Sequence, residues 1–533
     1  MPPSARHWLA GLALVAVLCV VAIVATAIVW LPRTAHMRER AIAALTNDLE
    51  SEVELESLET SLRPNPRIVL QNLAVRHKGR HDVPPLIQIR ALTVDVSLSG
   101  WRAHRLDQVN IAGLRIFIPP RARESGKPVS DGTTVKTTTP ETTTTSITTR
   151  GPAADWFIDH LTANDTTLLL GVREPGIPPR EFHIHRLAMS SVGPDRVMTF
   201  DAALSNPRPA GEIETVGTFG PWQKDTPSLT PLKATYTFSH ADLATFKGIG
   251  GILTSEGAFG GILERIDAAG TTTTPDFRLS IGGNTVPLTT RFKAVIDGTN
   301  GNTVLTRIDA VLGQTQMAVS GAVIGVRGVE GRTVTVAANI PNGRLEDLLR
   351  LVVKGKTPPL RGGIQVKTKM RLPPGDRDVV DKLQLDGEFH IMSARFDNLD
   401  IQSKIESLSR RGRGQPQEEG TGRTVSDVAG PFTMKNTVMT LPRLTFGVPG
   451  AAVRLSGRYH LRRETLDFLG TVRLQATVSQ TMTGVKRFFL KPIDPLFRRD
   501  GAGTVLPIRI GGTRGDPAFG LDVKSALRRR DPS

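Results

Sequence analysis

The amino-acid sequence predicts a mainly β protein, with an N-terminal transmembrane helix followed by a long antiparallel run of strands and a few short helices. Two observations predict this class. Residues Trp8–Leu31 contain no charged side chain. Beyond them, apolar and polar residues alternate with period two along most of the chain, which is typical of strands with one buried and one exposed face. Turn dipeptides separate these segments, so we expect hairpins between neighbouring strands.

The apolar segment Trp8–Leu31 is 24 residues long. At ~1.5 Å per residue, a helix of this length crosses the ~30 Å hydrocarbon core of a bilayer. The alternative is a cleaved signal peptide, for which Ala25-Thr26-Ala27 offers a small-residue site, but the apolar part of such a peptide is typically about 7 to 15 residues long. We therefore predict an uncleaved signal anchor within residues 1–33.

The charges beside this segment do not decide its orientation. Arg33, Arg38 and Arg40 follow the segment and only Arg6 precedes it. The positive-inside rule would then leave the body of the protein in the cytoplasm. Long domains are translocated largely regardless of such charges, so both orientations remain open on this count.

Composition narrows the classes of partner. The only cysteine, Cys19, lies in the apolar segment, so the body contains no disulfide, thiolate nucleophile or cysteine-based metal site. The 67 Lys and Arg residues exceed the 51 Asp and Glu residues, and the net charge of +16 attracts polyanions. Aromatic residues make up only 5% and the basic residues are scattered, which argues against nucleic acid. An anionic membrane surface is the nearer partner.

Strands are predicted wherever the alternation is clearest. The apolar members of these segments are Leu92, Val94, Val96 and Leu98, then Val109, Ile111, Leu114, Ile116 and Ile118, then Val334 and Val336, and finally Val453, Leu455, Tyr459, Leu461, Leu466, Phe468, Val472, Leu474 and Val478. The dipeptides Asp297-Gly298, Asn300-Gly301, Asn342-Gly343 and Asp386-Gly387 supply the positive φ that tight hairpins need.

Helical periodicity is confined to Ala35–Leu49, Leu345–Val353 and Leu399–Arg410. Residues 121–152 are rich in threonine without apolar periodicity, which indicates a linker or long loop. The resulting division is an anchor (1–33), a helix with entry strands (34–120), the threonine-rich linker (121–152), a central β region (153–380) and a C-terminal region (381–533).

No catalytic site is evident. The chain has no G-x-S-x-G nucleophile motif, and its carboxylates stand singly without the spacing of an acid and base pair. His183 and His185 would share one face of a strand with Glu181, which suggests a zinc site, but an exposed polar face explains them as well. We predict no enzyme, no catalytic residues, no metal and no cofactor.

Several blocks of sequence resemble the AsmA-like proteins of Gram-negative bacteria. The blocks are Phe396–Ser409, Phe446–Gly450 with Leu455–Tyr459, Ser479–Gly484, Leu490–Phe497, Gly503-Thr504, Pro507-Ile508 and Gly511–Phe519, together with the entry segment Pro66–Leu73. They cover about half of the chain. The threonine-rich segment is a departure from the family.

The resemblance implies an inner-membrane anchor carrying a periplasmic body folded as a repeating β-groove. Groove proteins of this kind move phospholipid between membranes, and the family is also tied to outer-membrane biogenesis. The expected partners are the inner membrane through Trp8–Leu31, phospholipids and outer-membrane components, and no nucleic acid. The alternative function is a non-catalytic scaffold that regulates the assembly or targeting of outer-membrane proteins, and a tethered hydrolase is a third.

An apolar groove explains why every strand alternates. The candidate lining residues are Leu92, Val94, Val96, Leu98, Val453, Leu455, Leu466, Phe468, Val472 and Leu474. About 25 strands at ~4.8 Å would extend roughly 120 Å. A closed β-sandwich, in which two apolar faces pack together, has the same periodicity, so the sequence pattern leaves both open.

Overall fold

A computed structural model gives the fold. It describes residues 38–39, 42–43, 46, 51–61, 66–77, 85–118, 157–170, 180–193, 195–223, 226–325, 331–355, 357–397, 399–416, 426–477 and 504–521. The predicted membrane anchor Trp8–Leu31 and the threonine-rich segment 121–152 lie outside these residues. Within them, no helix is both long and apolar enough to cross a membrane.

Most of the described chain belongs to one sheet of 23 strands, beside a ribbon of two strands. The strands of the large sheet are β1 (Ser51–Ser61), β2 (Arg67–His77), β3 (Ile87–Asp95), β4 (Arg105–Ile118), β5 (Phe157–Leu170), β6 (Arg180–Val192), β7 (Met198–Pro207), β8 (Ala210–Phe219), β9 (Pro231–Asp242), β11 (Ile252–Ile262), β12 (Arg265–Thr274), β14 (Leu288–Ile296), β15 (Thr303–Leu312), β16 (Thr315–Gly325), β17 (Arg332–Arg344), β18 (Leu360–Leu372), β19 (Gln384–Phe396), β20 (Ser426–Lys435), β21 (Val438–Val448), β22 (Ala451–His460), β23 (Thr465–Leu474), β24 (Thr504–Gly512) and β25 (Pro517–Leu521). The ribbon pairs β10 (Ile249–Gly250) with β13 (Arg278–Leu279).

Each strand of the large sheet pairs with the next one along the chain, so the sheet grows in sequence order from β1 to β25. The sheet is continuous through residue 380, because β18 pairs with β19. A closed sandwich would need two large sheets packed face to face. That alternative is therefore wrong for the described residues.

One strand pair departs from the predicted antiparallel pattern. β4 and β5 run parallel, with Arg105 opposite Phe157 and Ile118 opposite Leu170. Ile118 and Phe157 therefore lie at opposite margins of the sheet, and parallel neighbours need a long crossover connection. The predicted linker 121–152 falls within this connection. Composition alone does not reveal that β4 and β5 run in the same direction.

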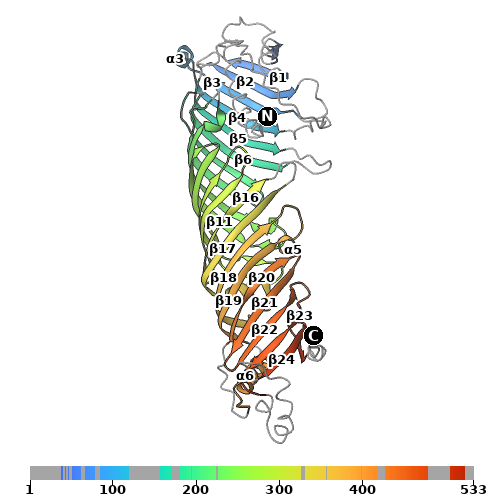
Figure 1. Cartoon of the computed structure of the whole chain (residues 1–533). Coiled ribbons are helices and arrows are strands. Elements are labelled where there is room, and N and C mark those ends of the chain that lie inside the picture. The colour runs from blue at the N-terminus through green and yellow to red at the C-terminus, as the bar shows by residue number, and fades with distance from the viewer. Residues whose placement is uncertain are drawn as a thin grey trace, which may run out of the picture.

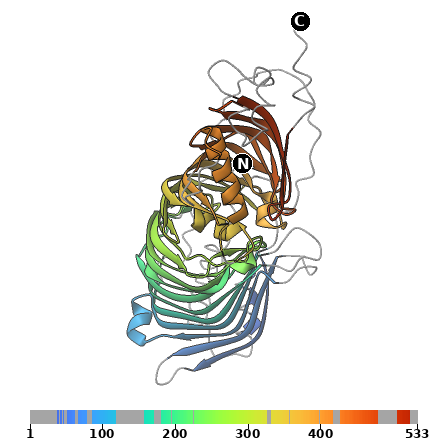
Figure 2. The ribbon, with the colours of Figure 1, turned by 90° about the horizontal axis from the view of Figure 1, so that it is seen from below.

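The sheet is long, twisted and curved across its strands, with one concave and one convex face (Figures 1 and 2). Figure 2 shows the orange helix α6 (Leu399–Gly412) lying within the curve. Its Ile405 packs with Phe432, Leu455 and Phe468 of the sheet. Alternate apolar residues of the strands therefore face the concave side.

Two buried clusters occupy the ends of the sheet. The N-terminal core joins β1 to β7 and includes Leu70, Leu92 and Val109, each fully buried. Ile42, one of the described helical residues in the predicted helix Ala35–Leu49, packs against it. The C-terminal core joins α6 to β20–β23. Smaller clusters lie under α4 (Leu345–Val352).

The short helices confirm part of the prediction. α4 and α6 match the helical segments expected at Leu345–Val353 and Leu399–Arg410. The remaining helical turns are α3 (Leu98–Arg102), α5 (Val379–Lys382), η2 (Pro227–Leu229) and η3 (Leu243–Thr245).

Two predicted hairpin turns are wrong. Asp386-Gly387 lies inside β19 and Asn342-Gly343 lies near the end of β17. The pairing register of β17 with β18 shifts between Ile340 and Gly343, so this dipeptide marks a bulge and the chain continues into α4. A turn-type dipeptide is compatible with a bulge as well as with a hairpin.

Candidate functional site

The concave face contains nine of the ten predicted lining residues. Eight are buried: Leu92, Val94, Val96, Val453, Leu455, Phe468, Val472 and Leu474. Leu466 is half-buried and packs against the C-terminal core. The tenth prediction, a strand position at Leu98, is wrong because α3 begins there.

Local capping ends the strand pattern before Leu98. The Ser97 hydroxyl accepts a hydrogen bond from the Gly100 amide at 3.0 Å. The Ser97 amide in turn donates to the Asp107 carboxylate. These bonds satisfy polar groups at the start of a helical turn, which is what serine and aspartate commonly do at such positions.

An unbroken apolar stripe follows the concave face through the middle of the sheet. Phe292 of β14 pairs with Ile308 of β15, which pairs with Val319 of β16, which pairs with Ala338 of β17. A parallel row runs through Val336 and Met370. Because side chains on one face of directly opposed residues lie about 4.5–5.5 Å apart, neighbouring members of the stripe are in contact range. Val336 was a predicted strand residue, but the lining residues predicted from the sequence include none from this central part.

The central stripe differs from the two ends in burial. Phe259, Phe292, Ile308, Val319 and Val336 are only half-buried. The sheet is a single layer here, and the described helices cover only part of its concave side. An apolar surface that continues across many strands without a protein layer over it is characteristic of an interaction site.

The convex face is mainly polar, although Val216, Val304 and Leu469 are also exposed there. Lys367 and Lys369 of β18 stand opposite Glu388 and Asp386 of β19. On β15 an exposed ion pair joins Arg307 and Asp309 at 2.9 Å. The hydrogen bond and the charge of Asp309 raise the pKa of Arg307 above its ordinary value. The two faces therefore differ sharply in chemistry, as strand alternation predicts.

The histidines singled out from the sequence lie on the exposed surface of β6. His183 contacts Glu181 at 3.4 Å, whereas His185 contacts Ser205 at 2.6 Å and Glu212 at 3.3 Å. The two imidazoles thus have separate partners. Among the described residues, no three potential metal ligands converge.

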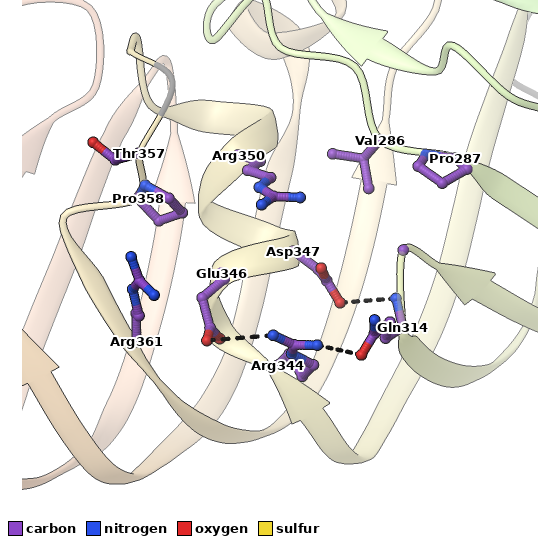
Figure 3. Close-up of a pocket in the computed structure, with 11 residues that line it drawn as sticks. Val286, Pro287, Gln314, Arg344, Glu346, Asp347, Arg350, Thr357, Pro358 and Arg361 are labelled. Carbon is purple, nitrogen blue, oxygen red and sulfur yellow. Dashed lines mark hydrogen bonds and ion pairs between the residues drawn. The ribbon is translucent and has the colours of Figure 1, made fainter.

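A charged pocket of about 410 Å³ lies beside α4, at the margin of the sheet (Figure 3). Asp347 is buried at the wall of this pocket, where it accepts hydrogen bonds from the backbone amide of Gln314 at 2.9 Å and from the Thr315 hydroxyl at 3.0 Å. Arg344 contacts Glu346 at 3.8 Å. The Asp347 bonds attach α4 to the turn between β15 and β16. The pocket lining holds three arginines, Arg344, Arg350 and Arg361, against the two carboxylates of Glu346 and Asp347, and Asp347 serves the attachment of α4.

The chain matches no protein-family model, and comparisons with curated proteins and with solved structures found no similar protein. The concave face is therefore interpreted from its own chemistry.

Proposed function

We propose that this protein is a membrane-anchored periplasmic carrier of phospholipid, and that the concave face forms the groove in which acyl chains lie. The observation that carries the proposal is the half-buried apolar stripe through Phe292, Ile308 and Val319, which continues between the two buried ends of the sheet. The polar convex face faces water in this arrangement.

The energetics suit a lipid that is held and yet moves. Each methylene transferred from water to an apolar surface contributes ~0.8 kcal/mol, so a long acyl chain is bound strongly. Sliding along the stripe costs little, since each methylene that leaves one strand meets the apolar side chain of the next. The headgroup stays at the open side of the groove, between the two margins of the sheet.

The predicted anchor sets the proposed direction of lipid movement along the groove. A helix at Trp8–Leu31 would hold the β1 end of the sheet at the inner membrane, where lipid could enter. At ~4.8 Å per strand, 23 strands correspond to about 105 Å of groove. The resemblance to AsmA-like proteins supports the outer membrane as the destination and outer-membrane biogenesis as the process served.

A charge placed within the stripe tests the proposal. We predict that Val319→Glu lowers the rate of phospholipid transfer between donor and acceptor vesicles by roughly tenfold or more, because an acyl chain passing an unpaired carboxylate forces its desolvation.

The matched control is Ala318→Glu, the preceding residue of β16, which is exposed on the convex face. It should transfer lipid at the unsubstituted rate. Equal transfer by both variants would overturn the proposal, and loss confined to Ala318→Glu would indicate a scaffold that works through its convex face.

A further inference from the structure

Strand direction assigns every connection to one of the two long margins of the sheet. From β5 onward all neighbouring strands of the large sheet are antiparallel. Consecutive connections therefore alternate between the margins. One margin, here called the α4 margin, carries four of these connections: the turn at Arg208, the segment with η3 and β10, the segment with β13, and α4. The β18–β19 connection with α5 and the β22–β23 turn lie on the opposite α5 margin.

The β18–β19 connection, residues 373–383, contacts the opposite margin. The Val379 amide donates to the Lys247 carbonyl at 2.8 Å. The Ser280 hydroxyl donates to the Asp378 carboxylate at 3.1 Å, across 98 residues of sequence. Arg208 approaches Asp376 at 3.8 Å. These residues join α5 to β7–β13 (Figure 1 labels α5).

These contacts join two margins that the curvature of the sheet brings together. The segment 373–383, which we call the clasp, thus bridges the open side of the concave face. The sheet continues on both sides of this bridge, toward the N-terminal core and toward the C-terminal core.

The clasp is held to the α4 margin by polar contacts of Asp376, Asp378 and Val379, of which the Arg208–Asp376 pair is exposed, while the neighbouring Val380 is buried. Arg462, from the β22–β23 turn on the same margin, pairs with Asp381 at 2.7 Å and with Asp378 at 3.6 Å. The Arg462 side chain is 47% exposed. Asp378 also caps α5 by accepting from the Val380 amide at 2.9 Å. Since the contacts across the margins are two hydrogen bonds and one exposed ion pair, each of modest stability, the closure can open and re-form without unfolding the sheet.

We propose that the clasp is a gate for the lipid headgroup. This inference rests on the proposed function. Acyl chains within the groove pass under the clasp, but a headgroup carried between the margins meets it directly. Lipid therefore moves from the N-terminal to the C-terminal part of the groove only while the contacts of Asp378 and Val379 with the α4 margin are broken.

A reversible covalent lock tests the gate. In a Cys19→Ser background, which removes the only native cysteine, Ser280→Cys and Asp378→Cys place two thiols at the contact between the margins. A second lock uses Lys247→Cys with Val379→Cys. A matched control pair, Gly325→Cys with Arg332→Cys, links β16 to β17 at the α5 margin, where these two residues face each other.

The readout is a photo-crosslinking side chain placed at the half-buried Ile116 or Leu466 in the full-length protein in cells. With either lock oxidised, we expect phospholipid adducts to persist at Ile116 and to fall at least tenfold at Leu466, with recovery on reduction. The oxidised control pair should leave both unchanged.

Undiminished adducts at Leu466 in both oxidised locks would overturn the gate. Absence of lipid at both positions in the reduced proteins would instead contradict lipid carriage itself, so the two failures are distinguishable.

Discussion

Glycines on the concave face explain how a single-layer sheet bends so far. A side chain on Gly321, Gly457 or Gly470 would fall on a backbone carbonyl oxygen of the next strand, that of the residue preceding the one that the glycine faces. At Gly270, a Cβ would come within 3.1 Å of the Phe292 ring and 3.0 Å of the Tyr236 hydroxyl. Glycine within a strand commonly marks a sharp bend or a close approach of another backbone.

Gly470→Ala is therefore predicted to destabilise the C-terminal strands by about 2 kcal/mol, since the new methyl displaces the backbone at Arg454. The midpoint of urea unfolding, followed by Trp or far-ultraviolet signals, measures the effect. Gly447→Ala in β21 is the matched control, because a Cβ there meets nothing within 4 Å. Equal midpoints for the two variants would refute this origin of the curvature.

At the two ends of the sheet, period-two alternation predicted which strand residues are buried, because alternation depends only on which face is buried. Leu98 was predicted wrongly because the hydrogen bonds of Ser97 start a helical turn there. The sequence pattern does not distinguish the glycines of the concave face from glycines in turns. Their role depends on which residue of the next strand faces them, and this register is not visible in one strand alone.

At the scale of elements, α4 shows how a short helix is fixed beside the concave face. Leu345 packs on Ile364 and Ile391, while Asp347 binds the β15–β16 turn through Gln314 and Thr315. The helix thereby covers one margin of the apolar surface. Its existence was predictable from periodicity, but the partner of Asp347 was not, because the turn that it binds lies more than 30 residues away.

Removing the Asp347 carboxylate should loosen this attachment without unfolding the sheet. For Asp347→Ala we expect a local loss of about 2 kcal/mol, because the partly buried backbone amide of Gln314 and the buried hydroxyl of Thr315 lose their acceptor. Amide hydrogen exchange at Gln314 and Thr315 should then accelerate by at least about tenfold. Arg350→Ala, an exposed position on the same helix, should leave exchange unchanged. Unaltered exchange in Asp347→Ala would show that the bonds do not hold the helix.

At the scale of the whole molecule, the local pattern predicted a mainly β chain but not the path of the sheet. The parallel pair β4–β5 and the contact between residues 373–383 and the opposite margin depend on long-range geometry. Alternation also left the sandwich and the open sheet equally possible, since both bury one face of every strand. The described strands resolve this choice in favour of a single curved layer.

Paired photo-crosslinking positions test most directly whether the concave face holds lipid. Three pairs of sequence neighbours alternate between the half-buried concave face and the exposed convex face: Val319 with Ala318, Val336 with Ala337, and Leu466 with Asp467. A photo-reactive side chain at Val319, Val336 or Leu466 should capture phospholipid in cells, while one at Ala318, Ala337 or Asp467 should not. Adducts with proteins alone, or lipid adducts equal on both faces, would contradict the claim.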